Sequence, residues 1–222
     1  MNTSALRRMV KAETERLLSA TQTIGLSVSS AQIEQLVTYV DLLEKWNRTY
    51  NLTAIRSRRE MFDRHLIESL SIAPFLLGQH RIDVGTGAGL PGLPLAIVEP
   101  DIDYVLLDSN GKKTRFLAEV KRSLGLSNIT VETVRVETWQ PDRLFDAVVT
   151  RAFADLATTF ERIDHVLGPQ GMLFAMKTES VNQEVAEMPS NMALAGSWDI
   201  SVPGRDWSFQ LLGVKRLPGD NT

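Results

Sequence analysis

The chain has 222 residues, 43% of them hydrophobic and 23% charged, which suits one sizeable globular domain with or without a small appendage. It has no cysteine, which excludes disulfides, thiolate metal sites and a cysteine nucleophile, and its three histidines argue against any metal site. No apolar run of about 18 residues occurs, so we expect no membrane span and no export, and we predict a monomer that works in the cytoplasm.

The formal net charge of −3 argues against a nucleic-acid partner only until its distribution is considered. Residues 1–66 hold ten Lys and Arg against seven Asp and Glu, a local balance of +3, so the remaining residues carry −6. A polyanion would therefore have to meet a local basic face near the N-terminus.

The first third of the chain predicts helices. Residues 4–20 carry apolar side chains at roughly helical spacing. Ser29 and Gln32 have the form of a capping box, and the apolar stripe after them predicts a second helix as far as Trp46. Helical pattern resumes over residues 64–70.

The segment between these helices is basic and contains aromatic residues. Lys45–Thr53 combines Trp, Tyr and Asn, and it is followed by Arg56, Arg58, Arg59 and Arg64. Arginines interleaved with such residues suit phosphate contacts and base stacking. A solvated loop whose aromatic side chains pack on the core is an equally good interpretation.

From residue 81 the pattern alternates between strand and helix and predicts an α/β fold. Strands are predicted at 81–84, 104–108, 129–132, 145–150 and 172–177. One helix is predicted at 112–124, and another follows the strand at 145–150 and ends at about residue 167. A turn is predicted at 168–171. A weakly helical stretch at 179–195 leads to two β-prone runs, 197–202 and 207–214, joined by the hairpin signal of residues 203–206. This alternation implies a parallel, doubly wound sheet that binds ligands at the carboxyl ends of its strands.

Residues 83–92, Asp-Val-Gly-Thr-Gly-Ala-Gly-Leu-Pro-Gly, are typical of a strand end, a glycine turn and a helix start. Such a turn lets the backbone approach a ligand, and the helix start is expected to present free N–H groups. From Gly87 onward the spacing fits the G-x-G-x-x-G fingerprint of dinucleotide-binding folds. A tight turn with a capping acid and no ligand is another interpretation of the same residues.

A second way to divide the loop begins at Asp83 and includes Gly85, Gly87 and Gly89. A carboxylate here suits a cationic ligand, because a diphosphate would be repelled. Pro91 also removes one N–H donor that a phosphate would use. This arrangement resembles motif I of the Rossmann-like S-adenosylmethionine-dependent methyltransferases, whose sheet ends in an antiparallel hairpin.

Further polar residues follow the strand ends. Asp108 comes about twenty residues after the glycine loop, where an acid can accept hydrogen bonds from both ribose hydroxyls of an adenosine. This position would serve NAD equally well. Asp108 could also be an acid that only caps a helix. Glu137, with the Val136 backbone, is placed to meet the amine of adenine, although it could as easily be a surface acid. Arg151 occupies the end of strand four, where methyltransferases of exocyclic amines commonly carry Asn/Asp-Pro-Pro-aromatic. The absence of that tetrapeptide favours a different acceptor atom.

The motifs together resemble the bacterial ribosomal RNA small-subunit methyltransferase G family, also called glucose-inhibited division protein B. The resemblance runs from about residue 25 to the final strand, and its departures are small: Glu68 stands where the family often has Asp, and Ala88 where Pro is frequent. The residues that carry it are Trp46-Asn47, Tyr50-Asn51-Leu52-Thr53, Arg64-His65-Leu66, Ser69, residues 83–92, Leu106–Ser109, Arg135-Val136-Glu137 and Thr150–Ala154.

The resemblance implies methyl transfer from S-adenosylmethionine to N7 of one guanine in 16S ribosomal RNA, free or in the small ribosomal subunit, without a metal. It implies residues 1–63 as an N-terminal helical region with the basic RNA-facing segment, and residues 64–222 as the methyltransferase domain. The site residues that we expect are Arg151, Arg64 and Asn47 at the reacting base; Asp83, Gly85, Gly87, Gly89, Leu90, Asp108, Val136, Glu137 and Arg151 at the cofactor; and Arg56, Arg58, Arg59 and His65 at the RNA.

Two other functions remain compatible with the sequence. An NAD(P)-dependent oxidoreductase would use the glycines from Gly87 to Gly92 together with Asp108, but Asp83, Pro91 and the terminal hairpin oppose it. A non-enzymatic adenosine-binding or RNA-binding module would use the basic N-terminal region as its working surface.

Overall fold

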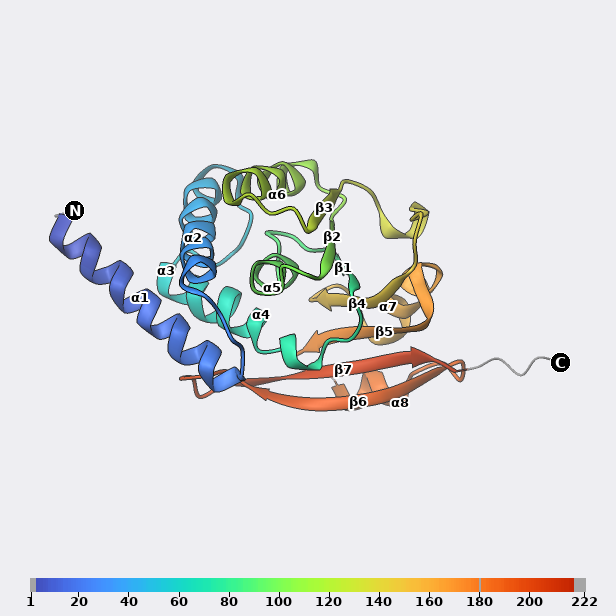
Figure 1. Ribbon diagram of the computed structural model, residues 1–222. Coiled ribbons are helices and arrows are strands. Elements are labelled where there is room, and N and C mark those ends of the chain that lie inside the picture. Colours follow the sequence, from blue (N-terminus) through green and yellow to red (C-terminus); the bar gives the residue numbers. More distant parts are fainter. Residues whose placement is uncertain (1–2, 180, 218–222) are drawn as a thin grey trace.

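The computed structural model describes residues 3–179 and 181–217, and its central element is a seven-stranded sheet (Figure 1). The strand order is β3-β2-β1-β4-β5-β7-β6; neighbouring strands are parallel as far as β5, and β7 is antiparallel to both β5 and β6. This confirms the predicted Rossmann-like methyltransferase sheet with its closing hairpin. The strands are β1 His80–Val84, β2 Asp103–Leu107, β3 Ile129–Glu132, β4 Phe145–Arg151, β5 Leu167–Lys177, β6 Met192–Ser201 and β7 Ser208–Arg216.

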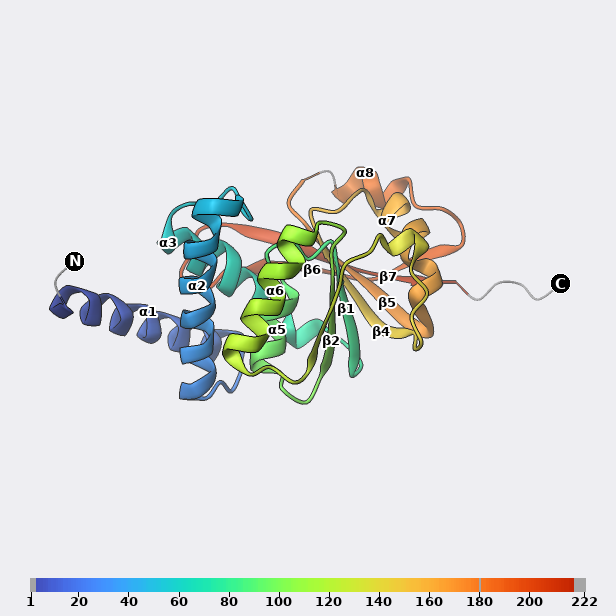
Figure 2. The same cartoon turned by 90° about the horizontal axis from the view of Figure 1, so that it is seen from above.

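Helices cover both faces of this sheet (Figure 2). Helices α5 (Gly92–Val98) and α6 (Gly111–Leu124) lie on one face, and α7 (Leu156–Ile163) and α8 (Val181–Ala186) lie on the other. Successive strand residues point to opposite faces, so Leu106 joins the cluster beneath α5 and α6, whereas Leu107 joins the cluster beneath α7. Because both faces are buried, the central parallel strands need apolar runs, and β2 and β4 have them in residues 104–107 and 147–149.

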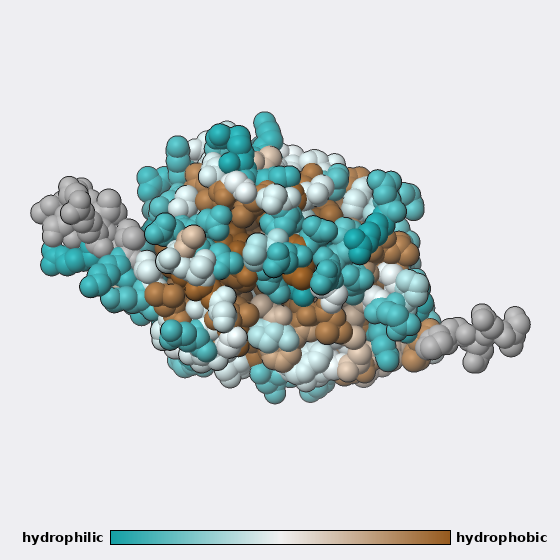
Figure 3. All heavy atoms as spheres, in the orientation of Figure 1, coloured by the Kyte–Doolittle hydropathy of each residue, from teal (hydrophilic) through white to brown (hydrophobic). Residues whose placement is uncertain are grey.

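Two long helices precede the sheet. Helix α1 spans Thr3–Ile24 and α2 spans Ser30–Tyr50. The predicted capping box is confirmed: the Ser29 hydroxyl accepts from the N–H of Gln32, and the Ser29 N–H donates to the Gln32 side chain at 2.8 Å. In Figure 3 the coloured atoms of α1 that project from the body are mainly hydrophilic. None of the described helices is long and apolar enough to cross a membrane.

The third helical segment begins earlier than predicted. It runs through α3 (Arg58–Glu60), the π-helical turn η1 (Met61–Ile67) and α4 (Glu68–Leu70), after a cap formed by Ser57. The sequence interpretation resumed helical structure only at Arg64 and left Arg58 and Arg59 in the basic segment before it. Further short helical turns, all of the 3-10 type, are η2 (Ala73–Phe75), η3 (Val136–Thr138) and η4 (Asp164–Val166).

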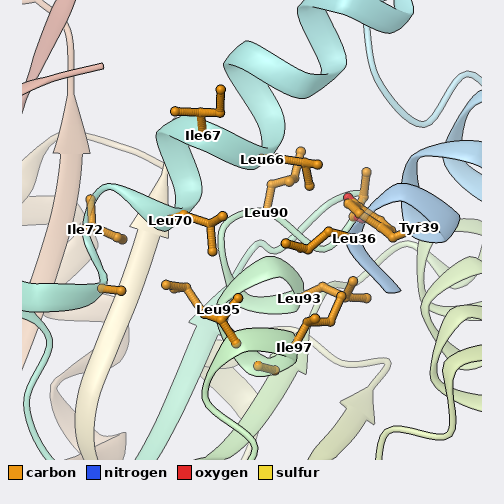
Figure 4. Packing of buried hydrophobic residues seen from close by; sticks show 14 of the residues in the cluster. Leu36, Tyr39, Leu66, Ile67, Leu70, Ile72, Leu90, Leu93, Leu95 and Ile97 are labelled. Atoms are coloured by element: carbon orange, nitrogen blue, oxygen red, sulfur yellow. The ribbon is translucent and has the colours of Figure 1, made fainter. Parts of the chain in front are cut away.

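One hydrophobic cluster joins the N-terminal helices to the sheet. Figure 4 shows Leu36 and Tyr39 of α2 facing Leu90 and Leu93 beside the glycine loop, with Leu66 of η1 above them. The hydrophobic core is continuous across residue 63. The division into an RNA-facing region, residues 1–63, and a methyltransferase domain, residues 64–222, therefore stays a prediction about which part contacts RNA and which part binds the cofactor.

Two strand boundaries differ from the prediction. Residues 168–171 form no separate turn; they belong to β5, where the pairing with β4 is irregular and an added Cβ on Gly171 would lie 2.6 Å from the Phe145 carbonyl oxygen. The weakly helical stretch contains only α8, and β6 begins at Met192, five residues before the predicted strand. The antiparallel partner β7 supplies the hydrogen bonds that extend β6, and local sequence gives no sign of them.

Candidate cofactor and acceptor site

The glycine loop lies between β1 and α5 at the carboxyl ends of the strands. Gly85, Gly87 and Gly89 have φ angles of +71°, +62° and +96°, a region that side chains disfavour. The N–H groups of Gly85 and Thr86 donate to the carbonyl of Leu107 at 2.9 and 3.1 Å. The loop is therefore tied to β2, and its three glycines are required by the backbone.

Asp83 is the buried acid that organises this loop. Its Oδ2 accepts from the Thr86 hydroxyl at 2.6 Å and from the N–H of Gly92 at 2.7 Å, while its Oδ1 is buried with no protein partner. Burial raises the pKa of this carboxyl from its ordinary 3.8 to about 7, against the lowering effect of its two hydrogen bonds and of Arg151. An unpartnered buried acceptor is costly and fits a site that awaits a cationic donor.

The N–H groups at the start of α5 are not free, which corrects the sequence interpretation. The N–H of Gly92 is bound by Asp83, that of Leu93 by the Gly89 carbonyl at 2.8 Å, and that of Gly87 by Asp108 at 2.9 Å. A pyrophosphate bound in the dinucleotide manner would need these donors. The loop geometry therefore opposes the NAD(P) alternative.

A cavity of about 90 Å³ opens beside the loop. Asp108 lies at one end, where its two oxygens accept from Gly87, Asn110 and the Lys113 ammonium. At the other end Arg162 pairs with Glu137, 3.4 Å from Nε to Oε1, and lies over the ring of Phe153. The cavity is lined by Val84, Gly85, Leu107, Asp108, Ser109, Val134, Arg135, Val136, Glu137, Phe153 and Arg162. The structure thus brings the predicted ribose and adenine residues together in one place.

Two predicted cofactor residues have packing roles instead of a side-chain contact. A Cβ on Gly89 would lie 2.8 Å from Leu117, so this glycine allows α6 to approach the loop. The Leu90 side chain is buried in the core, and its N–H donates to the Thr86 carbonyl at 2.8 Å, which leaves its carbonyl oxygen as the group that can meet a ligand.

A second cavity, of about 300 Å³, lies at the ends of β4 and β5 beside η1. Arg151, at the end of β4, donates to the carbonyl of Arg64 at 2.7 Å and to Glu68 Oε2 at 3.0 Å. The next residue, Ala152, has a φ of +49°, a strained conformation of the kind found at functional sites. The cavity is lined by Arg64, Glu68, Arg151, Ala152, Met176, Lys177, Thr178, Glu179 and Phe209.

Sequence reasoning missed several of these lining residues. Lys177 ends β5 at the ligand-binding edge of the sheet, so its position in the sequence could have indicated a site residue. Its ammonium donates to the Ala154 carbonyl at 2.5 Å and pairs with Glu184 at 2.8 Å. Glu68 and Arg162 lie on helices, and nothing in their local sequence indicates which strand ends they face.

Asn47 was expected at the reacting base and His65 at the RNA, but both side chains are buried. The Asn47 amide donates to the Ile55 carbonyl and accepts from the Thr53 N–H, so it holds the loop after α2. His65 Nε2 lies 2.9 Å from the Thr53 hydroxyl, and burial together with the charge of Arg151 lowers the pKa of His65 to about 4. A neutral, buried imidazole does not suit a phosphate contact, and a buried amide that holds the loop backbone does not suit a contact with the reacting base.

The predicted basic segment contains two kinds of arginine. Arg56 and Arg59 are exposed, and Arg56 donates to Asn51 Oδ1 at 2.5 Å. Arg64 is also exposed, with its guanidinium 5.0 Å from the Trp207 ring centroid. Arg58 is different, because its side chain is only 16% exposed and pairs with Glu13, Asp41 and Glu44. Arg58 therefore anchors α1 to α2 and does not suit a phosphate contact. Among the described residues no cluster of three or more His, Asp or Glu side chains could hold a metal ion.

The sheet order, the glycine loop with its buried acid and the adjoining cavity define the S-adenosylmethionine-dependent methyltransferase class. A solved structure with this fold is the magnesium protoporphyrin IX methyltransferase from Synechocystis PCC 6803 with bound S-adenosylmethionine, at a TM-score of 0.56 and 12% identity, covering 81% of this chain and 97% of that one. That likeness shows the fold.

The family is shown by sequence. The model of the rRNA small subunit methyltransferase G family matches residues 32–208. Ribosomal RNA small subunit methyltransferase G of Saccharophagus degradans is 47% identical over 85% of this chain and 84% of its own length, and that of Hydrogenovibrio crunogenus is 45% identical over 90% and 93%. The chain belongs to the rRNA small subunit methyltransferase G family.

We predict that Gly85→Ala weakens binding of S-adenosylhomocysteine at least about tenfold, because the new Cβ would lie 2.8 Å from the Phe153 ring that lines the cavity. The matched control is Gly125→Ala, with a similar φ of +66° and no atom within 4 Å of the new Cβ. The positive φ should cost both variants about 1–2 kcal/mol of stability, with a further loss in Gly85→Ala from the clash, but only Gly85→Ala should lose affinity in calorimetry. Equal affinities would show that Phe153 is not part of the cofactor pocket.

Proposed function

We propose that this protein transfers the methyl group of S-adenosylmethionine to N7 of a guanine in 16S ribosomal RNA. The observation that carries the proposal is the arginine at the end of β4, directly beside the second cavity. An amine acceptor needs hydrogen-bond acceptors around it, whereas Arg151 is purely a donor. Guanine N7 and O6 are both acceptors, so a guanidinium suits that edge of the base.

The arrangement around the glycine loop supports the following roles for the cofactor residues. Asp83 presents its unpartnered Oδ1 to the ammonium of the methionine moiety, and Asp108 accepts from the ribose hydroxyls once Lys113 shifts. Val136 and Glu137 meet the adenine at the far end of the first cavity, where Gly85 allows close approach. When bound, the cofactor supplies an electrophilic methyl group on a sulfonium.

The reaction needs positioning but no base. The lone pair of guanine N7 forms the new N–C bond, the S–C bond breaks with its electron pair left on sulfur, and no proton is lost. The work of the protein is therefore alignment and a suitable field. Arg151 donates to guanine O6, and Arg64, which is exposed beside Trp207, contacts a phosphate.

The RNA partner is 16S ribosomal RNA or the small ribosomal subunit, met in the cytoplasm by a monomer. Arg56, Arg59 and Arg64 are exposed and follow α2 in the chain, and Arg64 lines the second cavity. Tyr50 is 43% exposed, and its ring is tilted by 35° against that of Trp46 at 5.2 Å between centroids, so it offers an aromatic face for a base.

The test of the proposed function uses small-subunit particles that carry 7-deazaguanine at the modified position. Unsubstituted particles should accept radiolabelled methyl groups, and the product should be 7-methylguanosine by mass spectrometry. The deaza particles should accept none, because C–H replaces the attacking nitrogen while O6 and the pairing edge are kept. Methylation of the deaza particles would refute N7 as the acceptor. Cofactor binding without transfer to any particle would favour a non-enzymatic module.

We predict that Arg56→Gln with Arg59→Gln weakens binding to small-subunit RNA and lowers the salt slope by up to about 2, the value expected for loss of two phosphate contacts. Arg58→Gln is the contrasting variant. It should lower thermal stability, because it breaks the contacts with Glu13, Asp41 and Glu44, while the salt slope stays unchanged in the folded protein. Filter binding across salt concentrations measures both, and an unchanged slope in the double variant would place the RNA face elsewhere.

A further inference from the structure

Glu68 is a buried carboxylate in the second cavity that the reaction described so far does not use. Only 7% of the residue is exposed. Trp207 Nε1 donates to its Oε1 at 2.9 Å, and Arg151 Nη2 lies 3.0 Å from its Oε2. Each oxygen thus has one partner, and a carboxylate with about four lone-pair sites retains one acceptor site on each oxygen. The carboxylate is fixed in orientation, yet it can still accept twice.

The surroundings of Glu68 are built for a flat, apolar-faced ligand with polar edges. Met176 and Phe209 line the cavity and are themselves buried, so they supply the apolar wall. Burial raises the pKa of the Glu68 carboxyl above its ordinary value, and the charges of Arg151 and Arg64 and the Trp207 hydrogen bond offset only part of that rise. These three groups are the ones that stabilise the carboxylate form inside the cavity.

We propose that the Glu68–Arg151 pair selects guanine by binding its Watson–Crick edge, an inference that rests on the proposed function. Guanine presents in sequence the O6 acceptor, the N1–H donor and the N2 amine donor. Its complement is one donor followed by two acceptors, the pattern that cytosine presents to it. Arg151 beside the two oxygens of Glu68 reproduces that pattern in protein groups.

The same pairing places N7 toward the cofactor. On guanine, O6 lies between N1 and N7, so a base held by Glu68 at N1 and by Arg151 at O6 points N7 past Arg151. Past Arg151 lies the glycine loop, because β4 pairs with β1 at Asp83 and Val149, and the charge of Arg151 reaches the Asp83 carboxyl. Adenine, which has an amine in place of O6, would face Arg151 with a donor and is rejected.

Glu68 also suits the change in charge during the reaction. The positive charge leaves the sulfonium and appears on the purine, and no proton carries it away. A carboxylate hydrogen-bonded to the purine gains interaction energy as that charge develops, which is the condition for lowering the barrier.

The test compares Glu68→Gln with the wild-type chain on small-subunit particles that carry either guanine or inosine at the modified position. Inosine lacks only the N2 amine and keeps N1–H, O6 and N7. The wild-type chain should methylate guanine about tenfold faster or more, because inosine leaves one charge-assisted bond unmade. Glu68→Gln should be slower on guanine by about 100-fold and should show a guanine-to-inosine ratio near one.

Three controls separate this role from a structural one. Glu68→Asp, which keeps the charge, should recover part of the rate and the preference for guanine. Glu179→Gln, which changes an exposed carboxylate at the same cavity, should keep the wild-type ratio. Glu68→Gln should bind S-adenosylhomocysteine as the wild-type chain does. An undiminished preference for guanine in Glu68→Gln overturns the inference, whereas failure of the wild-type chain to methylate N7 at all overturns the proposed function.

Discussion

Replacing Arg151 with methionine is expected to lower the rate of methyl transfer about 100- to 1,000-fold, the range for loss of one preorganised donor in an active site. In the structure the guanidinium is held by the Arg64 carbonyl and by Glu68, so it needs no reorganisation to meet a base. Affinity for S-adenosylhomocysteine should fall tenfold or less. Single-turnover transfer to small-subunit particles measures the first effect, and calorimetry measures the second.

The methionine variant also removes the partner of a buried carboxylate, and the loss of stability must be separated from the loss of function. A double variant, Arg151→Met with Glu68→Gln, no longer buries an uncompensated charge. It should melt at a higher temperature than Arg151→Met and remain inactive. Recovery of activity together with stability would mean that Arg151 acts only by holding the fold.

Replacing Asp83 with asparagine is expected to weaken S-adenosylhomocysteine binding about 10- to 100-fold at pH 7.5, the range for loss of a hydrogen bond to a charged group. The wild-type affinity should rise with pH by up to about tenfold per unit below pH 7, because binding the ammonium requires a carboxylate whose pKa in the ligand-free fold is about 7. The groups that face this carboxyl are Thr86, Gly92, Asp108 and Arg151. The asparagine variant should show a flat profile over the same range.

The same pKa has the opposite effect on stability without a ligand. The folded-state pKa of Asp83, about 7, is raised above its ordinary 3.8, so the folded protein holds a proton that the unfolded chain releases. The stability from this proton is fully present below about pH 4 and is lost as pH rises to about 7. Relative to Asp83→Asn, the ligand-free wild-type chain should lose stability between pH 5 and pH 7.5. Urea unfolding at these pH values measures the difference. A parallel pH dependence in both proteins would contradict the assignment.

The hydrogen bonds of the glycine loop explain why one spacing could be divided in two ways. The letters from Gly87 to Gly92 satisfy a dinucleotide fingerprint, yet the N–H groups that such a loop would offer a pyrophosphate are bound by Asp83, Asp108 and Gly89. A fingerprint records where glycines are needed. It does not record which donors remain available, and that property distinguishes the two classes of cofactor.

The sequence by itself determined the sheet, its closing hairpin, the cap at Ser29 and the glycine loop with Asp83 and Asp108. These features rest on local physics: apolar runs for strands buried on both faces, side chains that satisfy neighbouring backbone groups, and glycines where φ is positive. Each strand, cap and turn requires only residues close in the chain, so each leaves a pattern that can be read, whereas pairing such as that of β1 with β4 joins distant segments.

Only the tertiary structure decided which charged residues are available. Arg58 and Arg59 are neighbours in sequence, yet the first is held by acids from two other helices and the second is exposed. Glu68 gains its importance from Arg151 and Trp207, which lie 83 (151 − 68) and 139 residues further along the chain. The use of a long polar side chain depends on partners that folding brings from distant positions, and a linear pattern does not contain those partners.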